Sequence, residues 1–260
     1  MNLVNLLSWI FFFLVVFPME GKKSLILIAS SDTELVYKVH KQSWRRYMNA
    51  FEDQFECYFV EFCTDLTTPY LLKNNILKIQ GQESYIPGIF DKSFKALEFF
   101  QDRLSEFDYI IRPNLSSFLI LPRLKKFLDH QTKKSFYAGP QSVFKNDEGR
   151  TGDDLDYATG TCIIFSTDLA YLLLENGKDL LGLNYSTYHA DDLLFARFFK
   201  KQHISLNPIP SFSIESYKEP HRFYHLIPED IFHFRVRTWG KDRYPLEKLI
   251  HQELYELFYE

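Results

Sequence analysis

The chain has 260 residues, which is enough for one large domain or two small ones with a sizeable hydrophobic core. Hydrophobic residues make up 46% and charged residues 25%, the balance of an ordinary globular protein rather than of a disordered chain. The formal net charge of −4 shows no positive surplus of the kind that nucleic-acid binding requires, so we expect no nucleic-acid partner.

An apolar stretch opens the chain at residues 4–17, interrupted only by Asn5 and Ser8. It is shorter than the ~20 residues that span a bilayer, and no Lys or Arg precedes it. Because it has no polar face and precedes the first predicted strand, we interpret residues 1–20 as a membrane-targeting segment rather than a core helix. A cleaved signal peptide, a short single-pass anchor and a peripheral helix all stay open. The expected location is a membrane or the secretory pathway, or host membranes if the chain is viral.

Strands and helices alternate through the first half of the chain. Residues 24–30 form an apolar run that predicts a buried strand, and Ser31 or Asp32 is suited to cap the helix that follows. Similar patterns predict strands at 57–62, 75–80, 109–111 and 135–139, and helices at 36–51, 90–104 and 122–129.

The second half begins with a polar segment at residues 141–156, which we interpret as a mobile loop. Patterns further on predict strands at 162–165, 204–209 and 231–237, and helices at 168–176, from 189 onward and at 246–257. Gly177 is expected to end the helix at 168–176. This alternation predicts an α/β sandwich with a largely parallel sheet, formed by a single domain over residues 24–260.

The three cysteines, Cys57, Cys63 and Cys162, cannot complete a disulfide framework, and their spacing matches no zinc site. Free thiols are the expectation, because two cysteines on one strand are poorly placed for a bridge. A Cys57–Cys63 bridge stays open as the alternative for an oxidising compartment.

Short polar patches follow the predicted strands or open the predicted helices. The apolar run 109–111 breaks into Arg112, Pro113 and Asn114, so this turn is expected at the carboxyl edge of the sheet, where open α/β sheets bind ligands. The other patches are Glu83-Ser84, Thr159-Gly160, Asp191-Asp192 and His233. A turn, a helix cap or a hydrogen-bonded histidine explains each patch equally well without a ligand.

Lys92 and Lys95 lie near the start of a predicted helix, where the helix dipole disfavours cations. A solvated surface lysine is the expectation at both positions, and a lysine held against an anion is the alternative.

In this order the patches resemble the GT-A glycosyltransferases of the β-1,3-galactosyltransferase and Fringe type, most of all the compact members predicted from giant viruses and some microbes. The resemblance implies a GT-A (nucleotide-diphospho-sugar transferase) fold, with a mostly parallel central sheet flanked by helices. It spans roughly residues 24–240, and the matching segments are 25–30, 81–89, 108–118, 137–139, 159–161, 191–193 and 232–235.

The resemblance implies a hexosyltransferase that moves a hexose-type sugar from a nucleotide sugar, a UDP-sugar first of all, to a hydroxyl of a glycan or glycoprotein with inversion. Such a reaction needs a carboxylate that takes the acceptor proton, and the resemblance places this base at Asp192 or Asp191. It assigns Thr159 and Gly160 to the acceptor or sugar pocket and His233, with Asn114, to a metal. The donor would be bound by Glu83, Ser84, Lys92, Arg112, Asn114 and Ser116.

The chain departs from this family at the metal motif. In the family, an acidic DxD-type motif holds a divalent ion, usually Mn²⁺, which stabilises the leaving nucleoside diphosphate. The equivalent positions here are Asn114, Leu115 and Ser116, without a carboxylate. Three interpretations stay open: Asn114 and Ser116 hold a metal weakly; Arg112, Lys92 or another cation replaces the metal; or the protein is a non-catalytic glycan- or nucleotide-binding protein on a degenerate scaffold.

Overall fold

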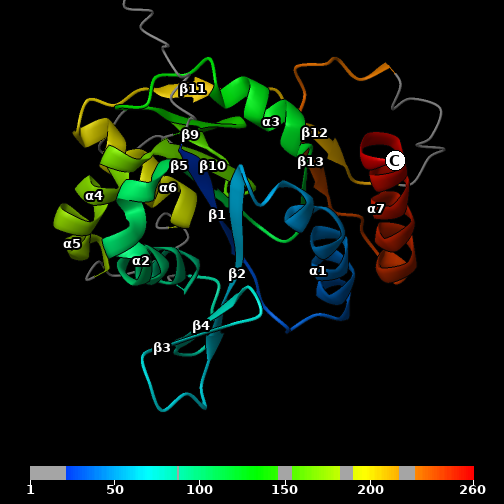
Figure 1. The fold of residues 1–260 in the computed structure, drawn as a ribbon, viewed down its shortest axis with the longest axis horizontal. Helices are drawn as coiled ribbons and strands as arrows, with labels where there is room; N and C mark the ends of the chain where they lie inside the picture. Colours follow the sequence, from blue (N-terminus) through cyan, green and yellow to red (C-terminus); the bar gives the residue numbers. More distant parts are fainter. Residues whose placement is uncertain (1–21, 87, 146–153, 182–189, 217–225) are drawn as a thin grey trace, which may run out of the picture.

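A computed structural model describes residues 22–86, 88–145, 154–181, 190–216 and 226–260. Its largest element is an eight-stranded sheet with the order β11-β7-β10-β5-β1-β2-β4-β3 (Figure 1). β10 and β3 are antiparallel to their neighbours, and the other pairings are parallel, so six of the eight strands point the same way. This confirms the predicted α/β class with a mostly parallel sheet. The strands are β1 (Lys23–Ala29), β2 (Phe55–Cys63), β3 (Tyr70–Lys73), β4 (Ile76–Gln80), β5 (Phe107–Pro113), β7 (Tyr137–Gly139), β10 (Cys162–Ser166) and β11 (Leu206–Pro208).

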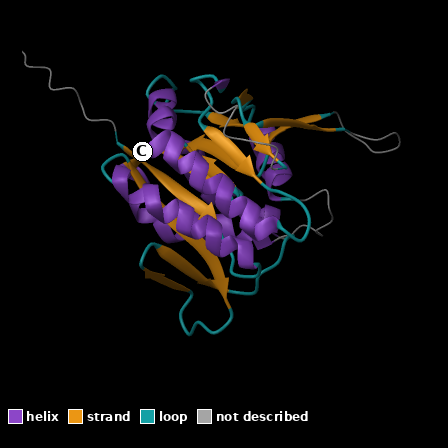
Figure 2. Ribbon diagram, turned by 90° about the vertical axis from the view of Figure 1, so that its right-hand side faces the viewer, coloured by secondary structure: helices purple, strands orange, loops and turns teal. Residues whose placement is uncertain are grey.

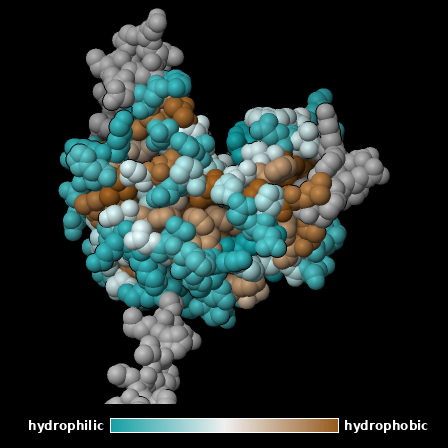
Figure 3. All heavy atoms as spheres, turned by 90° about the horizontal axis from the view of Figure 1, so that it is seen from above, coloured by the Kyte–Doolittle hydropathy of each residue, from teal (hydrophilic) through white to brown (hydrophobic). Residues whose placement is uncertain are grey.

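Helices cover both faces of this sheet. One face packs against α1 (Leu35–Tyr47), α3 (Leu121–Leu128) and α7 (Arg243–Tyr259), and the other against α2 (Gly88–Phe100), α4 (Thr167–Asn176) and α6 (Asp191–Lys201). Figure 2, seen from the side of α1 and α7, shows helices lying across the sheet. Figure 3 shows a surface on which hydrophobic side chains form patches among hydrophilic ones.

β1 shows why helices on both faces stabilise the central sheet. Ile26 and Ile28 belong to the core under α1 and α7, whereas Leu25 and Leu27 belong to the core under α2 and α4. All four side chains are at most 2% exposed. A strand that is buried on both faces needs apolar residues at every position, which is the continuous run seen in the sequence.

A smaller sheet positions the chain after β5. It consists of β6 (Ser117–Leu119), β13 (His233–Val236) and β12 (Phe212–Ile214), with β13 in the middle. β13 is antiparallel to β6, and Arg235 lies opposite Ser117. This pairing brings residues near 235 beside the turn at residues 114–116, although more than a hundred residues separate them in the chain.

Several predicted boundaries were wrong. The segment that we interpreted as a mobile loop contains β8 (Gln141–Phe144) and β9 (Leu155–Ala158), which form an antiparallel pair. These strands are half-exposed and polar, so their sequence lacks the apolar run that identifies a strand. The expected cap of α1 was also wrong: the residue before this helix is Glu34, and Ser31 instead accepts a hydrogen bond from the Thr33 N–H.

Shorter elements complete the fold. The ends of two predicted helices are separate 3₁₀ turns, η1 (Met48–Phe51) and η2 (Gln101–Glu106), and the edge strand β3 was not predicted. Gly177 follows α4 as predicted, and α5 (Lys178–Leu181) comes next.

The predicted membrane-targeting segment and His189 lie outside the described residues. Within the ranges that the structure describes, no helix is both long enough and apolar enough to cross a bilayer.

The expectation of free thiols is confirmed, since Cys57, Cys63 and Cys162 form no disulfide. Cys57 and Cys63 lie on the same strand, β2, where two cysteines are poorly placed to form a bridge. Burial raises the pKa of the Cys162 thiol to about 12, so this side chain packs as a small neutral group.

Gly139, the last residue of β7, is expected to tolerate no side chain. A Cβ atom there would lie 2.4 Å from the Ala158 Cβ and 2.6 Å from the Cys162 carbonyl oxygen, and neither atom belongs to a flexible side chain. Gly139→Ala should therefore lower the free energy of unfolding by about 1–3 kcal/mol or more, measured by urea denaturation. Gly160→Ala is the control, because its nearest contacts would be 3.4 Å away. Equal unfolding midpoints for the two variants would contradict this prediction.

Candidate functional site

A polar cavity of about 510 Å³ lies at the carboxyl ends of β1 and β5. Within the sheet, β2 and β4 lie on one side of β1, and β5 lies on its other side. The chain passes from β1 to β2 and β4 before it returns to β5. The connections therefore diverge between β1 and β5, and such a switch point is where open α/β sheets bind ligands. Ala29 of β1 and Asn114 after β5 form a parallel bridge at this point. The cavity is lined by residues 29–31, 33, 34, 37, 83–85, 89, 92, 114–116, 235, 237 and 243.

The turn at residues 114–116 forms one wall of this cavity and is electrically neutral. The Asn114 side-chain oxygen accepts a hydrogen bond from the Ser116 hydroxyl at 2.8 Å, and the Ser117 hydroxyl oxygen lies 3.1 Å from it. The Asn114 N–H donates to the Thr161 carbonyl at 3.2 Å. The oxygen that would have to replace the family's carboxylate is thus already held by hydroxyl groups of its own turn.

His233 is fully buried, and both of its ring nitrogens have partners. Nδ1 lies 2.7 Å from the Ser211 hydroxyl and Nε2 lies 3.2 Å from the Ser117 hydroxyl. Ser117 donates its proton to the Thr161 carbonyl, so Nε2–H donates to Ser117 and Nδ1 accepts from Ser211. Burial, aided by the Arg235 charge, lowers the pKa of His233 to about 3, so the ring is neutral. No ring nitrogen is left with a lone pair for a metal.

The donor set does not fit the divalent ion that the family resemblance implies. Across the described ranges, no group of three or more His, Cys, Asp or Glu side chains could hold a metal ion. The two residues predicted to hold it, Asn114 and His233, both use their ligand atoms in hydrogen bonds within the protein. Divalent Mn²⁺ prefers carboxylate oxygens, which this turn lacks.

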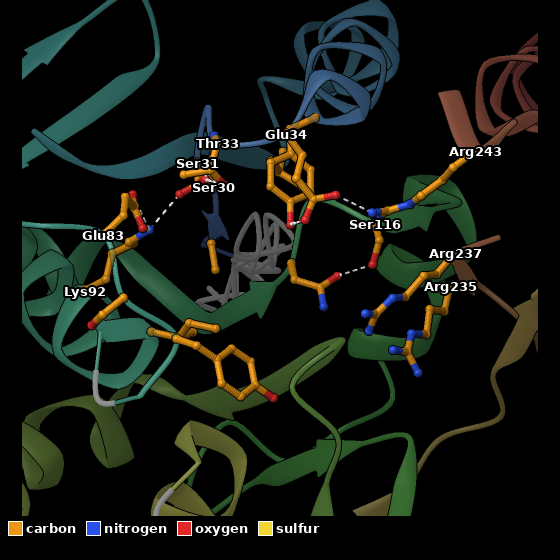
Figure 4. A pocket seen from close by; sticks show the side chains of 17 residues that line it. Ser30, Ser31, Thr33, Glu34, Glu83, Lys92, Ser116, Arg235, Arg237 and Arg243 are labelled. Atoms are coloured by element: carbon orange, nitrogen blue, oxygen red, sulfur yellow. Dashed lines mark hydrogen bonds and ion pairs between the residues drawn. The ribbon is translucent and has the colours of Figure 1, made fainter. Parts of the chain in front are cut away.

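Buried Lys92 and partly buried Glu83 form an ion pair at the opposite wall (Figure 4). Lys92 Nζ lies 2.7 and 2.8 Å from the two Glu83 carboxylate oxygens and donates to the Ser30 carbonyl at 2.6 Å. Glu83 also accepts from the Phe62 N–H at 2.9 Å. Lys92 is only 3% exposed, so the expectation of a solvated surface lysine was wrong there. Burial lowers the pKa of Lys92, and the Glu83 charge opposes this shift.

Arg235 and Arg237 line the cavity and were not predicted as site residues. They are two positions apart along β13 and its extension, so their side chains lie on the same face. Figure 4 shows both guanidinium groups pointing into the cavity near Ser116. The alternation Arg-Val-Arg at 235–237 in a predicted strand was the available sequence signal, but it did not reveal which element that strand would pair with.

Arg243, at the start of α7, also reaches the cavity but already has anionic partners. It forms ion pairs with Glu34 and, at 2.8 Å, with Glu247. Glu247 is fully buried and also accepts from the Thr238 N–H at 2.7 Å, while the His40 ring lies 2.6 Å from its other oxygen. This network fixes Arg243 and the start of α7 against α1.

The remaining predicted site residues form a second, internal cluster. Arg112 is 2% exposed, forms an ion pair with Asp191 and donates to the Gly160 carbonyl at 2.6 Å. The Gly160 N–H donates to the Asp192 carboxylate at 3.1 Å, and the Thr159 and Thr161 hydroxyls are 2.7 Å apart. Burial is the main cause that lowers the pKa of Arg112 to about 10.

The two groups adjoin at the Asn114–Thr161 hydrogen bond but do not share the cavity. Of the predicted donor-binding residues, only Arg112 is absent from the cavity lining, and its charge faces Asp191 instead. The predicted site residues therefore do not all line this one cavity. The residues outside the cavity lining are Arg112, Thr159, Gly160, Asp191, Asp192 and His233, and their roles in the reaction stay predictions.

No protein-family model and no curated protein matches this chain. Among solved structures, it is similar to a glycosyltransferase involved in the glycosylation of the major capsid of PBCV-1, with 11% identity and a TM-score of 0.49, covering 88% of this chain and 98% of that one. It is also similar to 4-diphosphocytidyl-2C-methyl-D-erythritol synthase of Anaerococcus prevotii DSM 20548 (10% identity, TM-score 0.40, 73% and 86% covered). A further synthase of that name has 11% identity, a TM-score of 0.41, and 79% and 97% covered.

Proposed function

We propose that this protein is a nucleotide-sugar-dependent glycosyltransferase on a GT-A scaffold, which moves a hexose-type sugar to a hydroxyl of a glycan. The observation that carries the proposal is a polar cavity at the β1/β5 switch point, into which Arg235 and Arg237 point without a carboxylate partner among the described residues. Guanidinium groups of this kind suit phosphoryl oxygens. The ordered motifs that resemble GT-A enzymes support a sugar nucleotide as the ligand that carries those oxygens.

The cavity also has the size and lining for such a donor. Its volume of about 510 Å³ falls within the ~300–1,000 Å³ that small-molecule sites occupy. The predicted donor residues Glu83, Ser84, Asn114 and Ser116 supply polar groups on two walls. Tyr85, 72% exposed at the cavity, adds an aromatic face for a sugar or base.

Asp192 is the better candidate for the catalytic base of an inverting transfer. Asp191 is bound to buried Arg112, whereas Asp192 is half-buried and forms no ion pair with the residues that the structure describes. In the proposed step the acceptor oxygen attacks the anomeric carbon and its proton passes to the Asp192 carboxylate. The bond to the diphosphate breaks at the same time, and its electron pair leaves with the nucleoside diphosphate.

A non-catalytic binding protein with the same cavity is the second candidate. The neutral turn at 114–116 and the engagement of Asp191 by Arg112 favour it, because both remove charged groups that a transferase of this family would use. Measured turnover of a nucleotide sugar distinguishes the glycosyltransferase from the non-catalytic binding protein.

The test incubates the full-length protein with a panel of UDP-, GDP-, dTDP- and CMP-sugars and measures nucleotide release with and without glycan acceptors. Asp192→Asn is expected to lower kcat by about 10²–10⁴-fold while leaving the Kd for the nucleotide unchanged. Asp179→Asn, on the exposed surface of α5, is the matched control and should retain full activity.

Turnover that is undiminished in Asp192→Asn would remove this base assignment. Nucleotide binding without turnover of any donor would favour the non-catalytic candidate. Absence of both binding and turnover would contradict both candidates.

A further inference from the structure

We infer that Arg235 and Arg237 bind the diphosphate of the donor and neutralise the charge of the leaving nucleoside diphosphate in place of a divalent metal. The inference rests on the proposed function and adds to it the groups that stabilise the departing anion. Its starting point is the mismatch between the implied metal and the residues that surround the turn at 114–116.

The sheet register places the two arginines beside the turn at residues 114–116, which stands where the family has its metal motif. Arg235 pairs with Ser117, and the Val236 N–H donates to the Ser116 carbonyl at 2.7 Å. β13 is thereby fixed beside the turn that follows β5. Since Arg235 and Arg237 share a strand face, both guanidinium groups enter the cavity next to Asn114 and Ser116 (Figure 4).

The charges of the cavity favour an anion over a dication. Four cationic side chains line it, Lys92, Arg235, Arg237 and Arg243, and the described lining carboxylates are Glu34 and Glu83. These charges sum to a net charge of +2 for the described lining. Glu83 already binds Lys92, and Glu34 already binds Arg243. A metal ion would thus meet a positive lining whose carboxylates are occupied, whereas a diphosphate would meet attraction.

Arg235 and Arg237 are the cations in this lining that remain available. Neither forms an ion pair with a described residue, although Arg237 packs over the Trp239 ring at 4.6 Å. The Nε of Arg235 is buried and has no hydrogen-bond partner in the described structure. A buried N–H without an acceptor is costly. A phosphoryl oxygen in the cavity would give the guanidinium group an acceptor, and the planar shape of that group allows bidentate contact.

The proposed chemistry needs no further reactant. As the anomeric carbon–oxygen bond breaks, its electron pair passes to an oxygen of the leaving diphosphate, where negative charge increases. Two fixed cations with aligned N–H donors stabilise that charge without reorganising, which is the task that a metal performs in related reactions. The acceptor proton goes to the Asp192 carboxylate, so charge and atoms balance.

The test is calorimetric titration of the full-length protein with UDP and, separately, with inorganic pyrophosphate, in excess EDTA and again with added Mn²⁺. We expect binding in EDTA with a Kd that Mn²⁺ does not tighten. Arg235→Gln and Arg237→Gln should each weaken pyrophosphate binding by roughly 10-fold to 100-fold. Arg46→Gln is the matched control, because Arg46 is exposed on α1 outside the cavity lining, and it should bind like the wild type.

Thermal melting of each variant without ligand checks folding. Neither arginine forms an ion pair with a described residue, so neither substitution breaks one. Both variants should therefore melt close to the wild type. Either variant alone is enough for the binding test. Binding of UDP and pyrophosphate only with Mn²⁺, or equal binding by wild type and both arginine variants, would overturn the inference. Sugar transfer that requires Mn²⁺ would overturn it while leaving the proposed function intact. Arginine-dependent pyrophosphate binding in EDTA without turnover of any donor would support the anion site and remove the proposed transfer.

Discussion

Asp191→Ala is expected to lower the free energy of unfolding by roughly 3–5 kcal/mol. Asp191 is 8% exposed and forms an ion pair with Arg112, which is 2% exposed. Without the carboxylate, the guanidinium stays buried and keeps its hydrogen bond to the Gly160 carbonyl. It loses its ion pair, and the Asp192 charge, which forms no ion pair with it, only partly offsets the cost of desolvating it. Urea denaturation of the wild type and the variant, followed by intrinsic fluorescence, measures the difference.

Two further variants separate this effect from a general loss of charge. Asp129→Ala removes the exposed partner of Lys125 and should change the free energy of unfolding by less than about 1 kcal/mol. Arg112→Met combined with Asp191→Leu removes both charges and should recover much of the lost stability. An Asp191→Ala variant as stable as Asp129→Ala would contradict the prediction.

This stability effect bears on how the catalytic base is identified. A loss of activity in an Asp191 variant would mix misfolding with chemistry, because that carboxylate compensates a buried guanidinium. Asp192 accepts a hydrogen bond from the Gly160 N–H and forms no ion pair with a described residue, although its charge also acts on Arg112. Asp192→Asn therefore gives the clearer measurement of catalysis.

Between pH 6.5 and 5 the protein is expected to lose stability at roughly 1.4 kcal/mol per pH unit for each of two buried histidines. Burial lowers the pKa of His233 to about 3 and lowers the pKa of His251 well below 6.5. In the unfolded chain both rings take up a proton near pH 6.5, whereas the folded protein keeps them neutral. Their stabilisation is therefore complete above pH 6.5 and is lost as the pH falls towards the folded pKa. Urea denaturation at several pH values measures the slope.

Single substitutions assign this slope to particular rings. His251→Gln and His233→Gln should each reduce the slope by the contribution of one histidine, whatever they do to stability at pH 7. The matched control is His130→Gln, because His130 is an exposed histidine. A slope that neither buried-site variant reduces would show that carboxylates, not these histidines, cause the acid sensitivity.

The fold was largely predictable because its signals are local. β1 and β5 are buried on both faces, and each needs a run of apolar residues that is visible without any partner. The helices likewise show their apolar stripe every three or four residues. The hairpin of β8 and β9 escaped prediction because half-exposed, polar strands lack that signal.

The site was only partly predictable. The turn at residues 114–116 could be placed at the carboxyl edge of the sheet, because a buried strand that breaks into Pro, Asn and Ser must end there. Arg235 and Arg237 could not be assigned to the same place, because they reach it through the pairing of β13 with β6. That contact joins segments far apart in the chain, and no local pattern specifies it.

The amino-acid sequence by itself determined the order of strands and helices and the neutral turn after β5, since periodicity and turn chemistry act over a few residues. Only the tertiary structure decided which charges neutralise one another and which face the cavity. Lys92 binds Glu83 and Arg112 binds Asp191, whereas Arg235 and Arg237 meet no carboxylate in the described structure. The physical reason is that a charge finds its partner through space, and that partner is set by how distant segments pack.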